Sequence, residues 1–126
     1  MKKIYDLKTC DTCKRILRSL PTEGFLFQEI KTEPITEDQL IEMKEMSGSF
    51  EALFSRRAKK YKEMGLKDIN LGEEDFKHYI LSDYTFLQRP VIIVDDKIFI
   101  GSGKKNLEAI ERLLITNYWP FIPRTL

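Results

Sequence analysis

The sequence predicts a single α/β domain in which a β-α-β unit and a β-β-α unit flank a group of helices. Short runs of strand character occur near both ends of the chain, and apolar residues with helical spacing follow each of them. Residues 36–83, between the two units, carry helix signals and no strand signal. A chain of 126 residues buries about two-thirds of its unfolded surface without disulfide bonds. We therefore expect one domain over residues 1–126, with residues 36–83 as its helical insert.

The β-α-β unit comes first. Residues 3–5 form a short strand, and residues 14–20 carry apolar side chains with the spacing of an amphipathic helix. Pro21 to Gly24 break this pattern, and the aromatic-rich residues 25–30 read as a second strand.

The insert begins with a helix-capping signal. Thr36 is followed three residues later by Gln39, as in a capping box, and the amphipathic helix that follows is expected to end at Gly48. A shorter helical piece is expected around residues 50–54. Residues 73–81 predict another helix, whose acidic first turn suits the positive end of the helix dipole.

A β-hairpin and a helix make up the β-β-α unit. Residues 91–94 are a β-branched run, residues 95–96 form an acidic turn, and residues 97–100 resume the strand pattern. Residues 106–114 carry apolar side chains on one helical face. The tail, about residues 116–126, is aromatic and interrupted by prolines, so we expect it to pack on the domain rather than continue the helix.

Charge and hydropathy argue against several function classes. Lys and Arg number 21 and Asp and Glu number 20, so the net charge of +1 gives no sign of a surface for nucleic acid or membranes. The N-terminal residues lack the apolar core of a signal peptide, and no apolar run approaches the roughly 20 residues of a membrane span. We expect a cytoplasmic protein that contacts neither nucleic acid directly nor a membrane.

The two cysteines of the chain, Cys10 and Cys13, form a Cys-Asp-Thr-Cys sequence where the first strand turns into the first helix. At a helix N-terminus, unpaired N–H groups and the helix dipole stabilise a thiolate. Lys8, Lys14 and Arg15 add positive charge nearby. Because Cys13 follows Cys10 by one helical turn, the two can also form a disulfide. We therefore predict a redox-active thiol at Cys10.

Two other interpretations of the cysteines remain open at this point. A zinc site needs two further ligands, and His78 is the one histidine of the chain, so carboxylates or a second chain would have to complete it. We assign no metal ligands for this reason. The second alternative is a pair of inert, partly buried thiols that act as small apolar side chains.

The order of these features resembles the thioredoxin fold, which combines a strand, Cys-x-x-Cys at a helix start, and a later X-Pro step before a hairpin and a final helix. The resemblance implies a four-stranded mixed sheet and a cis peptide at Arg89-Pro90 that faces the cysteines. The helical insert narrows it to the arsenate reductase and Spx-like branch of that superfamily. The resemblance covers about residues 3–114 of this chain.

The resemblance also implies an oxyanion site. Residues 54–66 resemble the segment Asn-Thr-Arg-x-x-x-Tyr-x-x-Leu of this branch, which makes Arg57 an oxyanion-binding arginine, with Ser55 in place of Asn. Arg89 matches a second such arginine, and Thr12 and Pro90 support the site. Arginine suits this role because its planar fork binds two oxygens at once. The other basic residues between 56 and 62 read as a solvated charged face.

The function that the resemblance implies is a thiol-dependent oxidoreductase similar to arsenate reductase. Cys10 attacks an oxyanion such as arsenate, or a disulfide, and Cys13 resolves the adduct. No bound cofactor is expected, and glutathione with glutaredoxin, or thioredoxin, supplies the electrons. An alternative is an Spx-like redox-sensing regulator that binds RNA polymerase. A general disulfide reductase of the glutaredoxin kind would leave the arginines and the insert unexplained.

The chain departs from the glutaredoxin-coupled arsenate reductases at three positions. Ser102 stands where those enzymes carry a third arginine, and Asp6 stands where they have a histidine, so that its carboxylate should raise the pKa of the Cys10 thiol. Cys13 replaces a serine and supplies an internal resolving thiol. The phosphatase-like arsenate reductases are excluded, since Ile16 lies where their Cys-x5-Arg loop needs arginine.

Overall fold

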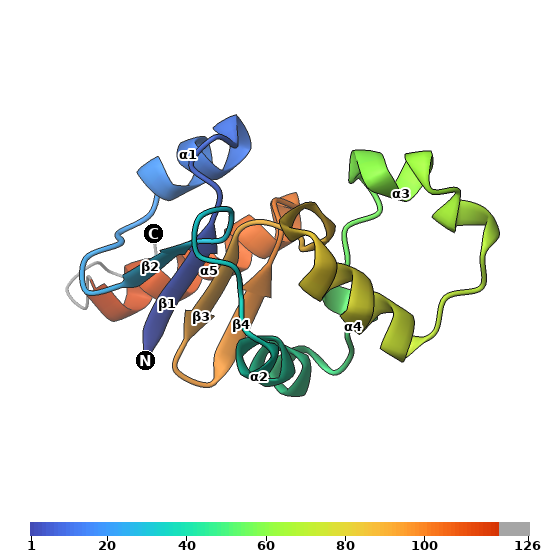
Figure 1. Cartoon of the computed structure of the whole chain (residues 1–126). Helices are drawn as coiled ribbons and strands as arrows, with labels where there is room; N and C mark the ends of the chain where they lie inside the picture. Colours follow the sequence, from blue (N-terminus) through green and yellow to red (C-terminus); the bar gives the residue numbers. More distant parts are fainter. Residues whose placement is uncertain (119–126) are drawn as a thin grey trace.

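A four-stranded mixed sheet forms the centre of the computed structural model, which describes residues 1–118 (Figure 1). The strands lie in the order β2-β1-β3-β4. The central strand β1 pairs in parallel with β2 and antiparallel with β3, which forms a hairpin with β4. The strand bounds are β1 Lys2–Asp6, β2 Leu26–Glu29, β3 Val91–Val94 and β4 Lys97–Ile100. The predicted α/β class and the four-stranded mixed sheet are confirmed.

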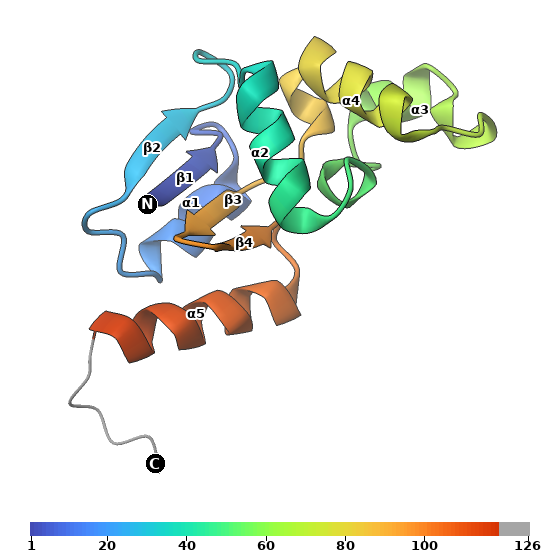
Figure 2. The ribbon, with the colours of Figure 1, turned by 90° about the horizontal axis from the view of Figure 1, so that it is seen from below.

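Helices cover both faces of the sheet (Figure 2). Helices α1 and α5 pack on one face, and α2 lies with the rest of the insert on the other. The helix bounds are α1 Asp11–Arg18, α2 Glu37–Ser47, α3 Lys59–Glu63, α4 Glu73–Ser82 and α5 Lys104–Tyr118. Three short 3-10 turns join them at η1 Glu51–Leu53, η2 Leu66–Asp68 and η3 Tyr84–Phe86. None of the helices in this part of the chain is both long and apolar enough to cross a bilayer.

Alternation along the central strands divides the interior into two cores. In β1, Ile4 packs towards α1 and α5, whereas the next residue, Tyr5, packs towards the insert. In β3, Ile92 faces the first core and Ile93 the second. All four residues of β3 are buried, which explains why this strand is uniformly apolar in the sequence.

Local signals and aromatic packing hold the insert. The backbone N–H of Gln39 donates to Thr36 Oγ1 (3.1 Å) and the N–H of Thr36 donates to Gln39 Oε1 (3.0 Å), so the predicted capping box is confirmed. The ring of Phe54 lies 4.9 Å from that of Phe76 and 5.4 Å from that of Phe86, centroid to centroid. Phe54 therefore anchors the segment that carries the two adjacent arginines.

Two helices differ from the expected bounds. Helix α1 starts at Asp11, ahead of the expected residue 14, because Cys10 acts as its N-cap. Helix α5 runs from residue 104 to residue 118 and so includes the start of the expected tail. Between the start of α5 at residue 104 and Pro120 the sequence contains neither glycine nor proline, which explains the extension. The predicted packing of the tail concerns residues 119–126, which lie outside the described part of the chain.

Candidate functional site

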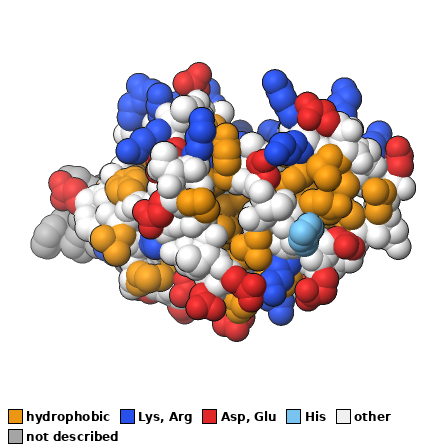
Figure 3. All heavy atoms as spheres, viewed as in Figure 1, with side chains coloured by type: hydrophobic (Ala, Val, Ile, Leu, Met, Phe, Trp, Pro, Cys, Tyr) orange, Lys and Arg blue, Asp and Glu red, His pale blue; other side chains and the backbone are white. Residues whose placement is uncertain are grey.

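A pocket of about 520 Å³ opens where the two halves of the fold meet. Its walls come from four separate segments, namely the start of α1 with Cys10 and Thr12, residues 54–57, residues 88–89 and residues 101–103. The pocket thus brings Cys10 together with both predicted arginines. Lys and Arg side chains gather over α1 and around α3, which increases the local positive potential for an approaching anion (Figure 3).

Cys10 is held at the N-terminus of α1 by its own backbone. Its N–H donates to the carbonyl of Leu7 (3.0 Å), and its carbonyl accepts the N–H of Lys14 (3.1 Å). Burial opposes ionisation of the half-buried thiol. The backbone N–H and thiol of Cys13, the charge of Arg89 and the N–H of Thr12 outweigh burial and lower the pKa of Cys10. Cys10 therefore has the character of a nucleophile.

Cys13 has the opposite character. Its side chain is 1% exposed, and it lies behind Cys10 rather than on the pocket wall. Burial, the hydrogen bond that its thiol makes to the Cys10 sulfur, and the charge of Cys10 raise the pKa of Cys13 to about 12. Both cysteines are free thiols. The pair therefore divides into Cys10, whose pKa is lowered, and Cys13, which stays protonated at neutral pH and is in contact with it.

Arg89 is anchored through one nitrogen. Its Nη1 donates to the carbonyls of Tyr84 (3.5 Å), Thr85 (3.4 Å) and Leu87 (3.3 Å). Its Nε is buried and has no hydrogen-bond partner among the described residues. A buried N–H without an acceptor costs about 1–3 kcal/mol, so this pocket-lining guanidinium favours a ligand that brings an oxygen.

Arg56 and Arg57 both line the pocket but have different partners. Nη2 of Arg56 bonds Glu51 Oε2 at 2.8 Å, and its guanidinium lies 5.6 Å from the centre of the Phe76 ring. Arg57 is exposed and forms no hydrogen bond or ion pair with any described residue. Of the two, Arg57 has the guanidinium available for a ligand.

The supporting residues are placed as follows. Thr12 lines the pocket, and its N–H contributes to the low pKa of Cys10. Pro90 is buried, its peptide with Arg89 is cis as predicted, and its carbonyl accepts the N–H of Gly101 (2.9 Å). Ser102 lines the wall formed by residues 101–103, which therefore carries no positive charge from this residue.

Asp6 is the acidic residue that was expected to raise the pKa of Cys10. Asp6 is buried at the end of β1, where burial and the charge of Glu29 raise its own pKa. The pKa of Cys10 is nonetheless lowered, so the expected effect of Asp6 does not dominate.

Gln88 lies on the pocket wall and had no predicted role. Its position directly before Arg89 was the one sequence signal that pointed to it.

The described residues contain no group of three or more His, Cys, Asp or Glu that could hold a metal ion. His78, the additional ligand considered for zinc, is exposed on α4, and its ring packs 5.4 Å from that of Tyr79. The polar side chains that line the pocket with Cys10 are those of Thr12, Ser55, Gln88, Ser102 and the three arginines.

Known proteins with similar structures share this fold. The arsenate reductase of Vibrio cholerae aligns with a TM-score of 0.66 at 19% identity, covering 87% of this chain and 95% of that one. An arsenate reductase related protein of Brucella melitensis aligns with a TM-score of 0.66 at 23% identity, covering 86% and 92% of the two chains. These structures support the predicted thioredoxin-like α/β fold.

The sequence is also similar to a regulator. The global transcriptional regulator Spx of Lactiplantibacillus plantarum is 24% identical over 114 residues, which cover 88% of this chain and 84% of that protein. The ArsC family model matches residues 5–110, a range that includes all four walls of the pocket. The chain belongs to the ArsC family.

Proposed function

We propose that the protein is a thiol-dependent oxidoreductase in which Cys10 attacks an oxyanion or a disulfide and Cys13 resolves the adduct. The observation that supports this most is the position of a half-buried thiol with a lowered pKa in one pocket with Arg57 and Arg89. Cysteines with these properties are typical of catalytic thiols rather than of structural ones.

In this proposal the two arginines bind the anion and orient it towards the sulfur. Arg89 presents a side chain whose Nη1 is already anchored, so little side-chain entropy is lost on binding. Arg57, which belongs to the helical insert, lines the pocket on another side. The same positive charges stabilise the Cys10 thiolate before the substrate arrives.

With arsenate as substrate, the Cys10 thiolate attacks arsenic(V), a sulfur–arsenic bond forms, and an arsenic-bound oxygen leaves as water after protonation. Cys13 then loses its proton to the arsenic-bound oxygens or to water and attacks the Cys10 sulfur. The sulfur–arsenic bond breaks, its electron pair remains on arsenic, and arsenite leaves. A Cys10–Cys13 disulfide is left, and two electrons reduce it, either from the dithiol of thioredoxin or from two glutathione molecules through glutaredoxin.

A disulfide substrate would follow the same course. Cys10 attacks one sulfur and the other leaves as a thiolate. Cys13 then displaces the remaining thiol from Cys10. The uncharged wall formed by residues 101–103 favours such a substrate, which carries an organic group beside its sulfur.

The experiment that tests this function measures alkylation of Cys10 as a function of pH, with and without arsenate, together with turnover in a thioredoxin or glutaredoxin system. We expect a Cys10 pKa below its usual value of about 8.5, and slower alkylation when arsenate is present. Turnover of arsenate and of a small disulfide no faster than that of Cys10→Ser would overturn the proposal.

A second candidate function is a redox-sensing regulator that binds RNA polymerase, with the Cys10–Cys13 disulfide as its switch. Similarity to Spx over 114 residues favours it. Pull-down of purified RNA polymerase by the oxidised and the reduced protein tests this candidate directly. Binding that depends on the redox state supports it, and no binding in either state rules it out.

A further inference from the structure

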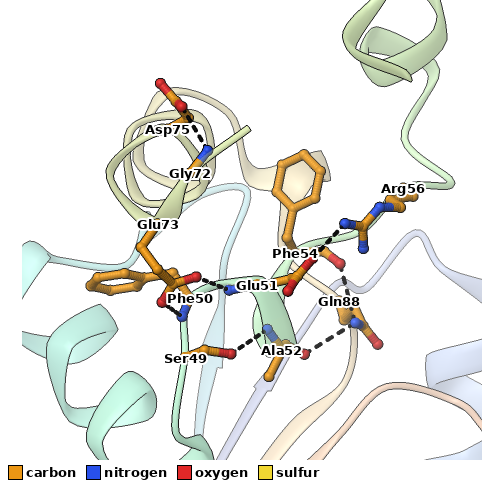
Figure 4. A network of polar contacts seen from close by, with 10 residues as sticks. All are labelled: Ser49, Phe50, Glu51, Ala52, Phe54, Arg56, Gly72, Glu73, Asp75 and Gln88. Atoms are coloured by element: carbon orange, nitrogen blue, oxygen red, sulfur yellow. Dashed lines mark hydrogen bonds and ion pairs between the residues drawn. The ribbon is translucent and has the colours of Figure 1, made fainter. Parts of the chain in front are cut away.

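Gln88 connects two walls of the pocket. Its Nε2 donates to the carbonyls of Ala52 and Phe54, each at 3.1 Å, and its backbone N–H donates to the carbonyl of Leu53 (2.9 Å). Figure 4 shows the side-chain amide pointing at the segment that leads into the adjacent arginines. Both amide hydrogens of Gln88 are therefore committed to the backbone just before Arg57.

The same segment is held at its other end by Glu73 of α4. The carboxylate accepts the N–H of Phe50 at 2.7 Å and the N–H of Glu51 at 3.1 Å. In Figure 4 these contacts lie on the side of the segment opposite Gln88. The segment is thus fixed between Glu73, which lies away from the pocket wall, and Gln88, which is part of it.

The amide of Gln88 also packs against the opposite wall. A Cβ atom on Gly101 would lie 2.7 Å from Gln88 Oε1, so the chain has glycine where the amide needs the space. Gly101 has φ +83°, and its N–H bonds the carbonyl of Pro90. The side chain of Gln88 therefore lies between the segment that carries Arg57 and the turn that carries Ser102.

We propose that Gln88 is a positioning residue that holds Arg57 at the distance from Arg89 and Cys10 at which both arginines bind one anion. Gln88 acts through the backbone of residues 52–54, because its own N–H donors are already bonded there. The inference rests on the proposed anion pocket, and it assigns the geometry of that pocket to a residue outside the thiol and arginine set.

The test compares two alkylating reagents on Cys10, the anionic iodoacetate and the neutral iodoacetamide, with peptide mass spectrometry to resolve Cys10 from Cys13. The ratio of the two rates reports how strongly the pocket attracts an anion. It is expected to be high in the wild-type protein and low in Arg57→Ala. Gln88→Met keeps the length of the side chain and loses both donors, and it should lower the ratio by about threefold to tenfold.

Gln88→Leu, which also loses both N–H donors and adds no charge, is the second variant in case Gln88→Met folds poorly. The matched control is Glu73→Gln, which weakens the other end of the segment. It should lower Tm while leaving the ratio unchanged.

The outcomes separate the two proposals. A wild-type ratio no higher than that of Arg57→Ala would refute the anion pocket, and with it both the positioning role of Gln88 and an oxyanion as the substrate of the proposed function. A high wild-type ratio that persists in folded Gln88→Met would refute the positioning role alone. A ratio that falls equally in Glu73→Gln and Gln88→Met would reduce Gln88 to general structural support. The iodoacetamide rate of Gln88→Met, followed across pH, corrects the ratio for any change in the thiol itself.

Discussion

The guanidinium of Arg89 stabilises the thiolate of Cys10 across the pocket, although the two residues belong to opposite halves of the fold. Burial disfavours the thiolate, and the charge of Arg89 is one of the interactions that outweigh it, together with N–H groups at the start of α1. The same guanidinium is held by three backbone carbonyls of residues 84–87. The reactivity of Cys10 thus depends on the backbone of residues 84–87, which holds Arg89 in place.

Replacing Arg89 should raise the pKa of Cys10. Arg89→Met removes the positive charge and keeps the buried thiol, so the thiolate fraction at neutral pH falls, about tenfold for each unit by which the pKa rises. The rate of alkylation by iodoacetamide, followed from pH 5 to pH 10, measures the change. The rate rises with pH as the thiolate forms, so the midpoint should move to higher pH. An unchanged midpoint would contradict the assigned interaction.

Cys13 should have two separable effects. Cys13→Ala removes the thiol that hydrogen-bonds the Cys10 sulfur and so raises the pKa of Cys10, whereas Cys13→Ser keeps a hydroxyl donor and shifts it less. Both variants lack the resolving thiol and should accumulate an adduct on Cys10 with a disulfide substrate. Intact-protein mass spectrometry detects the adduct. Release of the adduct at the wild-type rate in both variants would exclude Cys13 as the resolving residue.

Arg57 and Arg56 form a matched pair of neighbouring substitutions. Arg57→Ala should raise the arsenate concentration that half-protects Cys10 by about tenfold to a hundredfold, because a charge-assisted hydrogen bond contributes about 1.5–3 kcal/mol. Arg56→Ala breaks the exposed ion pair with Glu51, which changes the free energy of unfolding by less than about 1 kcal/mol, and should leave protection near wild type. The reverse result would assign the anion to Arg56.

A cation added to the wall formed by residues 101–103 should increase the affinity of the pocket for an anion. Ser102→Arg places a guanidinium on the uncharged wall and should lower the half-protecting concentration of arsenate about tenfold. Ser102→Ala is the control and should change little. Equal protection in Ser102→Arg and in wild type would mean that this wall does not face the bound anion.

Gly101 should tolerate alanine less well than Gly24. Both have positive φ, +83° and +82°, so alanine adds backbone strain of about 1 kcal/mol or more at each. Only at Gly101 would the new methyl group also meet Gln88 Oε1, whereas nothing lies within 4 Å at Gly24. Urea unfolding should show a larger loss for Gly101→Ala. Equal losses would mean that the Gln88 amide moves aside freely.

Short-range features of the fold were predictable from the sequence because their causes are local. The capping box of Thr36 and Gln39, the end of α2 at Gly48 and the uniformly apolar β3 depend on neighbouring residues alone. The position of Cys10 at a helix start was equally local. The end of α5 was misjudged, since the expected helix was stopped at Leu114, the last residue counted on its apolar face, rather than at the next true breaker.

The site was predictable in part. Family resemblance named Arg57 and Arg89, but spacing alone could not separate Arg57 from Arg56, because their difference depends on contacts with Glu51 and Phe76. The role of Gln88 left no pattern in the sequence, since its partners are backbone carbonyls more than 30 residues away along the chain.

Periodicity, capping and the Cys-x-x-Cys sequence were sufficient to establish the α/β class, the insert and the candidate nucleophile. They are properties of residues within a few positions of each other, which is the range over which helices and strands form. The pocket required the folded chain. The strand order β2-β1-β3-β4 and the two-sided packing bring four distant segments together. This proximity places Arg57 and Arg89 in one pocket with Cys10, adds the charge of Arg89 to the local groups that lower the pKa of Cys10, and the folded chain buries Cys13.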